Sequence, residues 1–358
     1  MPPACDVDQE RVVRGFETWL GGRLPGARVD TVGLPPTGAS NGTFLCGVQL
    51  PDGARRDLVL RLQPIENQFL DPDVLFQSRV MAALARHSQV PVPNVVWEEP
   101  DATVLGTPFV VMDRVPGDVL SDSHHSEGWA LELRAEQRAV MYDRCLDVFV
   151  ALHTTPLVEP LEFLRRPGSG PAVDRHVQWL QRWHQWAARG RSLPVIDAGL
   201  RYAVENCPDD RSEAVLWGDA RPGNMLFRPD MSVAAVLDWE LAATGPAEID
   251  LGWWLMFEDS QTVARGVARL EGVPSDDEIV ARYEQRIGRP VRDLAYWRVV
   301  AALEFAIIVQ RYCDMQIAAG RLEPDSALAA DSPAMRLLAE GVGVGSASLG
   351  GAGHGGRP

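Results

Sequence analysis

The sequence contains no lysine, because all 34 of its Lys and Arg residues are arginines. Any phosphate-binding cation must therefore be an arginine, which can hold a phosphate through two parallel hydrogen bonds. The 49 acidic residues give a formal net charge of −15. We therefore expect no nucleic-acid binding, because that function needs clustered basic residues. An acidic surface keeps a protein soluble and attracts cationic small molecules.

Cysteine is also scarce, with five scattered residues and no C-x-x-C pair. This pattern argues against a disulfide framework or a zinc site and predicts a protein of the reducing cytoplasm. The N-terminus has neither a basic nor an apolar segment, so we expect no signal peptide. The longest apolar stretch, residues 294–309, is interrupted by Arg298 and Glu304. It predicts a buried helix rather than a membrane span.

Hydrophobic periodicity divides the chain into two lobes and a tail. The patterns in residues 1–113 indicate a helix, a β-hairpin, a second helix and two further strands. This order predicts an α+β lobe with a mostly antiparallel sheet. Residues 114–340 carry mainly helical patterns, with strand-like pieces at 225–227 and 233–237. Residues 341–358 are rich in Gly, Ala and Ser and are expected to form a disordered tail.

The segment from residue 216 to 252 carries three acceptor side chains at a specific spacing. Asp219 and Asn224 form a D-x-x-x-x-N pattern, and Asp238 ends an apolar run. Phosphoryl transfer needs such a set, because one carboxylate accepts the proton of a hydroxyl while an amide oxygen and a second carboxylate hold Mg²⁺. Arg221 is close enough in sequence to reach the γ-phosphate. The alternative is a polar turn in which these residues are caps.

These motifs resemble the aminoglycoside phosphotransferase family, also known as choline-kinase-like phosphotransferases. The family pattern H-G-D-x-x-x-x-N, I-D-W/F-E and D-L-A/G corresponds to residues 217–224, 237–240 and 250–252. The chain is similar to an actinobacterial branch of the family in two motifs. These are W-G-D-A-R-x-G-N at residues 217–224 and L-G-T-P-F-x-x-M-D at residues 105–113. The resemblance covers about residues 12–338 and implies a bilobal, protein-kinase-like fold with ATP in the cleft.

The resemblance also implies roles for individual residues. Asp219 would be the catalytic base, and Asn224 and Asp238 would hold Mg²⁺. Asp250 would tie the catalytic loop together. Glu240, just past the metal ligand, would either line the acceptor pocket or face the surface. Three more candidates for acceptor contacts follow in the sequence: Trp254, Glu258 and Asp259.

The Gly-rich loop at residues 37–43 precedes a strand, where the family folds a loop over the triphosphate. Glycines let the backbone approach closely, and N–H groups and polar side chains donate to phosphate. The candidates are Ser40, Asn41, Gly42 and Thr43. An ordinary turn is the alternative for this loop.

Two further features belong to the expected nucleotide site. Arg61 lies in a strand where kinases have a phosphate-binding lysine, and Gln77 stands where they have the glutamate that pairs with it. Gln77 could accept a hydrogen bond from Arg61, but its neutral amide would hold the guanidinium without an opposite charge. The run 109–115 resembles the interlobe hinge. Its candidates for adenine contacts are Met112, Asp113 and Val115.

Two functions remain open. The first is an ATP- and Mg²⁺-dependent kinase that phosphorylates a hydroxyl of an aminoglycoside, another natural product or an endogenous metabolite. The second is a pseudokinase that binds nucleotide as a regulatory module, suggested by Arg61, Gln77 and Trp217 in place of Lys, Glu and His. The retained catalytic and metal-binding set favours the kinase. His124 and His125 are expected to be ordinary loop residues.

Overall fold

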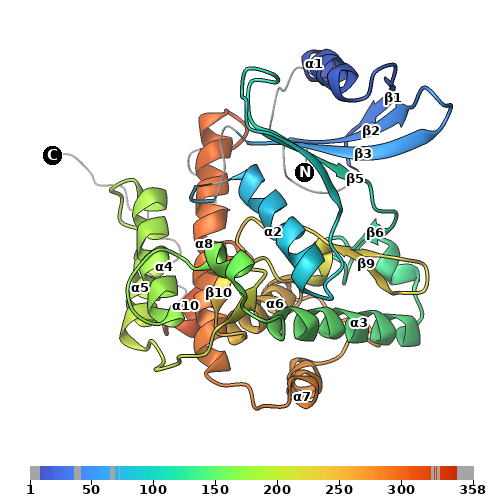
Figure 1. The fold of residues 1–358 in the computed structure, drawn as a ribbon. Helices are drawn as coiled ribbons and strands as arrows, with labels where there is room; N and C mark the ends of the chain where they lie inside the picture. The colour runs from blue at the N-terminus through green and yellow to red at the C-terminus, as the bar shows by residue number, and fades with distance from the viewer. Residues whose placement is uncertain are drawn as a thin grey trace.

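The structure is a computed structural model that describes residues 9–35, 42–64, 69–71, 73–323, 326, 328 and 331–344. Most of the predicted tail at 341–358 lies outside these residues. Figure 1 shows a sheet with one helix above it, and a larger, mainly helical part below. This is the expected α+β, bilobal arrangement.

The first lobe follows the order predicted from the sequence. Its elements are α1 (Gln9–Arg23), β1 (Arg28–Gly33), β2 (Thr43–Gln49), β3 (Arg55–Leu62), α2 (Val74–His87), β4 (Val95–Glu99) and β5 (Phe109–Asp113). The five strands form one sheet in the order β1-β2-β3-β5-β4, and every pairing is antiparallel. Arg61 lies in the middle of this sheet, opposite Thr43 on one side and Val110 on the other.

The second lobe is mainly helical, with short strands around the catalytic segment. Its elements, with η for a 3₁₀ helix, are β6 (Asp118–Val119), η1 (Trp129–Glu132), α3 (Ala135–His153), η2 (Glu159–Leu164), α4 (Ala172–Ala188), α5 (Pro194–Glu205), β7 (Ala214–Leu216), η3 (Pro222–Asn224), β8 (Met225–Phe227), β9 (Val233–Val236), β10 (Ala243–Gly245), α6 (Glu248–Gln261), η4 (Val263–Arg265), α7 (Asp276–Ile287), α8 (Leu294–Ala318) and α10 (Pro333–Gly341). No helix in the described ranges is long and apolar enough to span a membrane.

The two faces of the sheet belong to different hydrophobic cores. Side chains alternate along β5, so Phe109 and Val111 pack with α1, whereas Val110 and Met112 pack with α2 and the second lobe. The apolar face of α2 therefore joins the larger core, and Figure 1 shows α2 between the sheet and the lower helices. This packing fixes the sheet, and Arg61 within it, above the catalytic segment.

Helix α6 was not predicted from the sequence. All but one of its residues are buried, so it lacks the apolar and polar alternation that marks a surface helix. Gly252 permits this packing, because a Cβ at this position would lie 2.8 Å from the backbone carbon of Trp297 on α8. The helix places Asp250, in its first turn, beneath the catalytic loop.

Candidate active site

Residues 217–224 form the candidate catalytic loop, here called the catalytic loop. It leaves β7 through a turn that only glycine fits well. Gly218 has a φ of +90°, and a Cβ there would lie 2.5 Å from the Leu241 carbonyl oxygen. The buried carboxylate of Asp250 accepts the N–H groups of Trp217 (2.8 Å) and Gly218 (2.9 Å). His153 lies 3.1 Å from the same carboxylate. Asp250 therefore holds the backbone of the loop, as the family resemblance implies.

Trp217 stands where the family pattern has histidine, and it connects the catalytic loop to the next turn. Its indole N–H donates to the carbonyl oxygens of Leu237 (2.8 Å) and Asp238 (3.1 Å). The ring is buried and packs against Trp239 and Phe149. Trp217 thus supplies both a hydrogen-bond donor and apolar packing at this point.

Three donors surround the carboxylate of Asp219. Its Oδ1 accepts from Trp253 Nε1 (2.9 Å) and Arg221 Nε (3.1 Å), and its Oδ2 accepts from Asn224 Nδ2 (2.6 Å). Burial raises the pKa of Asp219 above its ordinary value, although the Arg221 charge opposes this shift. A fixed carboxylate with a raised pKa is suited to accept a proton from a hydroxyl.

A short hairpin brings the two predicted metal ligands together. Asn224 ends η3 just before β8, and its carbonyl oxygen accepts the N–H of Leu237 at 2.8 Å. The Nδ2 of Asn224 is committed to Asp219, which leaves Oδ1 without a donor among the described residues. Asp238 has a φ of +56°, a strained conformation for a residue with a Cβ. Amide and carboxylate oxygens are ligands that Mg²⁺ prefers, so this donor set fits it.

Arg61 reaches across from the sheet to the carboxylate of Asp238, one of the two predicted metal ligands. Its Nη1 lies 2.6 Å from Asp238 Oδ1, and its Nη2 lies 4.0 Å from Glu240 Oε2. Burial lowers the pKa of Arg61, but the charges of Asp238 and Glu240 raise it above its ordinary value. Burial raises the pKa of Glu240 to about 8, with Arg61 opposing. Glu240 is thus near the site, mostly shielded from solvent.

The expected hydrogen bond between Arg61 and Gln77 is absent from the described part of the chain. Gln77 is buried on α2, and Arg61 turns instead toward Asp238. The physical reason is charge, because a carboxylate binds a guanidinium more strongly than a neutral amide does. In this conformation Arg61 is paired with Asp238, and a role of Gln77 in the nucleotide site stays a prediction.

Only part of the predicted nucleotide loop can be placed. Ser40 and Asn41 lie outside the described residues, whereas Gly42 and Thr43 lead into β2. Gly42 approaches β3 closely, since its carbonyl accepts the N–H of Leu62 at 2.7 Å. A Cβ at Gly42 would lie 2.8 Å from the Leu62 carbonyl oxygen. The end of the loop therefore lies directly beside the strand that carries Arg61.

The three hinge candidates differ in which hydrogen-bonding groups they leave available to a ligand. Asp113 accepts from Arg56 (2.8 Å) and Asn94 (2.7 Å), and its own N–H donates to the Asn94 carbonyl. Met112 is buried in the larger core. The N–H of Val115 has no partner among the described residues, so it remains a donor for a ligand.

The candidates for acceptor contacts lie deeper than expected. Trp254 and Glu258 are buried, and Glu258 already accepts from His125 and Tyr142. Asp259 forms an ion pair with Arg298. An acceptor would have to open this packing to reach Trp254 or Glu258, so the geometry favours a structural role for both.

Arg221 is directed toward Asp219, the predicted base, rather than into open space. It donates to Asp219 and to Asp122, and its guanidinium carbon lies 4.6 Å from the centre of the Phe257 ring. Asp122 was missed in the sequence, because no motif links it to the catalytic loop. Trp253 as a donor to Asp219 was also missed, although it directly follows the D-L-G motif.

Comparisons with known proteins agree with this geometry. Residues 32–303 match the family described as "Phosphotransferase enzyme family". The mouse protein "Acyl-CoA dehydrogenase family member 10" is 28% identical over 286 residues, which are 75% of this chain and 25% of that protein. The chain therefore spans about a quarter of this relative's length.

Solved structures share the fold. A Ralstonia eutropha protein named for its likeness to aminoglycoside phosphotransferases has a TM-score of 0.68 at 24% identity, covering 92% of this chain and 97% of that one. The aminoglycoside phosphotransferase APH(4)-Ia, solved with ADP and hygromycin B, has a TM-score of 0.58 at 13% identity, with 92% and 98% covered. These likenesses confirm the kinase-like fold predicted from the motifs. The family match spans most of the sequence, and the chain belongs to the phosphotransferase enzyme family.

Proposed function

We propose that the chain transfers the γ-phosphoryl group of ATP, with Mg²⁺, to a hydroxyl of a small molecule. The observation that carries this proposal is the grouping of Asp219, Asn224 and Asp238 by the loop after β7 and the β8–β9 hairpin. Each residue has the type and orientation that phosphoryl transfer needs. A set of polar turn caps would not require three donors on Asp219 and a strained backbone at Asp238.

Asp219 would act as the base. As the bond between the acceptor oxygen and the γ-phosphorus forms and the bridging P–O bond breaks, Asp219 accepts the hydroxyl proton. Trp253 and Asn224 hold the carboxylate in place during this step. Mg²⁺, held by Asn224 Oδ1 and Asp238, would neutralise charge on the nucleotide phosphates.

The nucleotide would lie between the sheet and the catalytic loop. The free N–H of Val115 is suited to the adenine edge, and the backbone at Gly42 and Thr43 to the phosphates. Arg61 would exchange its contact with Asp238 for the phosphates, which frees Asp238 for the metal. Binding of nucleotide and metal would therefore open the Arg61–Asp238 ion pair.

The Arg61→Met variant tests this exchange. We expect its KM for ATP to rise about 10- to 100-fold, because one charge-assisted phosphate contact is lost. The Arg61→Lys variant should retain most of the affinity, since lysine also binds phosphate. Arg55 is a matched control: it lies on the same strand, half exposed and paired with Asp30. Initial rates would measure KM, and an unchanged value for Arg61→Met would remove Arg61 from the nucleotide site.

The proposed activity is tested by a phosphotransfer screen with ATP and Mg²⁺. The panel should include hygromycin B, because a structural neighbour was solved with it. Hydroxylated acyl-CoA esters belong in it because relatives are named for acyl-CoA dehydrogenases. Amino alcohols represent cationic metabolites. Mass spectrometry of the acceptor identifies the product, and ATP binding without turnover of any acceptor would favour the pseudokinase.

A further inference from the structure

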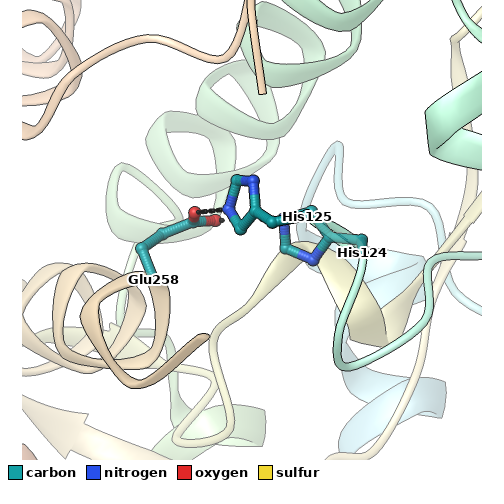
Figure 2. A group of neighbouring side chains, drawn as sticks. All are labelled: His124, His125 and Glu258. Atoms are coloured by element: carbon teal, nitrogen blue, oxygen red, sulfur yellow. Dashed lines mark hydrogen bonds and ion pairs between the residues drawn. The ribbon is translucent and has the colours of Figure 1, made fainter. Parts of the chain in front are cut away.

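The loop between β6 and η1 enters the core of the second lobe through two adjacent histidines. His124 and His125 are only 3% and 4% exposed. Figure 2 shows them facing Glu258 of α6, and His125 Nε2 lies 2.7 Å from Glu258 Oε2. Burying two imidazoles and a carboxylate is costly unless their polar atoms are satisfied. Their hydrogen bonds therefore indicate what the cluster does.

The donor directions in this cluster are fixed by the neighbouring backbone. The N–H of Leu270 donates to His125 Nδ1 at 3.2 Å, so Nε2 carries the proton and donates to Glu258. Tyr142 donates its hydroxyl proton to Glu258 Oε1 at 2.7 Å. The Tyr142 oxygen lies 2.8 Å from His124 Nε2, and His124 Nδ1 lies 3.3 Å from the Ser121 carbonyl oxygen. His125 and Tyr142 thus both donate to one carboxylate.

The pKa shifts in the cluster agree with donors that converge on Glu258. Burial raises the pKa of Glu258, but the hydrogen bond from His125, the two histidines and the hydroxyl of Tyr142 lower it to about 2. Burial lowers the pKa of His124, with the charge of Glu258 opposing. The cluster therefore gathers its hydrogen-bond donors on one buried carboxylate.

His124, His125 and Glu258 also have the residue types and spacing of a metal site. A metal ion on His125 Nε2 would require the proton on Nδ1, where it would face the N–H of Leu270. Two donors would then oppose each other in the core. The hydrogen bonds therefore favour a structural network over a metal centre.

One connection between this network and the catalytic loop runs through Asp122. Asp122 lies two positions before His124 and forms an ion pair with Arg221, which donates to Asp219. The loop is thus fixed on one side to Glu258 and on the other to the proposed base. A shift of this loop would move the guanidinium that neighbours Asp219.

We propose that His125, Tyr142 and Glu258 are positioning residues, which fix the loop of Asp122 so that Arg221 is held against Asp219. The proposal rests on the proposed kinase function for its effect on turnover. Its structural part concerns only the order of the catalytic loop.

The Tyr142→Phe variant is the test, because it removes one hydroxyl that joins His124 to Glu258. Amide hydrogen exchange in residues 217–224 should become faster, and kcat should fall about 2- to 30-fold with little change in KM for ATP. The matched control is Tyr296→Phe, which removes another buried hydroxyl bond, to the Ala203 carbonyl at 2.8 Å. It should lower the Tm similarly and leave exchange in residues 217–224 unchanged.

A double-mutant cycle separates positioning from general stability. In an Asp122→Asn background, Tyr142→Phe should add nothing to the exchange of residues 217–224 or to the loss of kcat, while still lowering the Tm. Additive effects, or exchange no faster than in Tyr296→Phe, would overturn the proposal. So would stoichiometric zinc in the purified protein that disappears in His125→Asn. Hydrogen exchange needs no turnover, so the test stands even if no acceptor is phosphorylated.

Discussion

The Asp219→Asn variant should lose about 10²- to 10⁴-fold in kcat for phosphoryl transfer, the range supplied by a positioned base. An amide of the same shape cannot accept the hydroxyl proton. The side chain contacts Trp253, Arg221 and Asn224 rather than a part of the proposed adenine site. We therefore expect the affinity for ATP to change little. Initial rates and calorimetric titration with ATP measure the two effects separately.

Asp230 provides the control for this substitution. It lies exposed between β8 and β9, where it accepts from Ser232, so Asp230→Asn changes an aspartate of the neighbouring hairpin outside the site. Its kcat should equal that of the wild type. If Asp219→Asn retains wild-type turnover on a phosphorylated acceptor, another residue is the base.

The Asp250→Ala variant should have the largest effect on stability. Its carboxylate is fully buried and accepts from Trp217, Gly218 and His153. Alanine leaves these donors without an acceptor in the core, and loss of a buried charged partner costs about 3–5 kcal/mol. Urea unfolding followed by circular dichroism would measure the loss in free energy of unfolding.

Asp277 is a suitable comparison because it also lies in the first turn of a helix, α7, but is exposed. Asp277→Ala should cost about 0.3–1 kcal/mol through the helix dipole alone. The Asp250→Asn variant keeps one oxygen acceptor and should fall between the two. Equal unfolding midpoints for Asp250→Ala and Asp277→Ala would contradict the role of Asp250 as the anchor of the catalytic loop.

The sequence predicted those elements whose signals are local. Asp73 caps α2, and Ser275 forms a capping box with Glu278 at the start of α7, so both helices begin at a local capping signal. Helix α6 escaped prediction because burial on all sides removes periodicity. Helix α5 begins at Pro194, a residue type that favours the first turn of a helix.

In the candidate site too, local features could be predicted and contacts between distant elements could not. Asp219 and Asn224 are recognisable because their spacing is set within one loop. The contact between Arg61 and Asp238 joins residues 177 positions apart, and it depends on how the sheet sits on the second lobe. The burial of Glu258 likewise follows from partners on other elements, His125 and Tyr142, so its sequence position beside Asp259 suggested an exposure that it does not have.

The arginine at position 61 also affects how this protein can be detected. Acyl-phosphate derivatives of ATP label kinases by transferring an acyl group to an amine beside the bound nucleotide. Arg61 offers a guanidinium in place of that amine at the proposed nucleotide site, and a guanidinium is a far weaker nucleophile toward an acyl phosphate than an amine is. The sequence has no lysine to take its place. Amine-directed profiling would therefore find no side-chain amine at the proposed nucleotide site, whereas arginine-selective dicarbonyl reagents could report on Arg61.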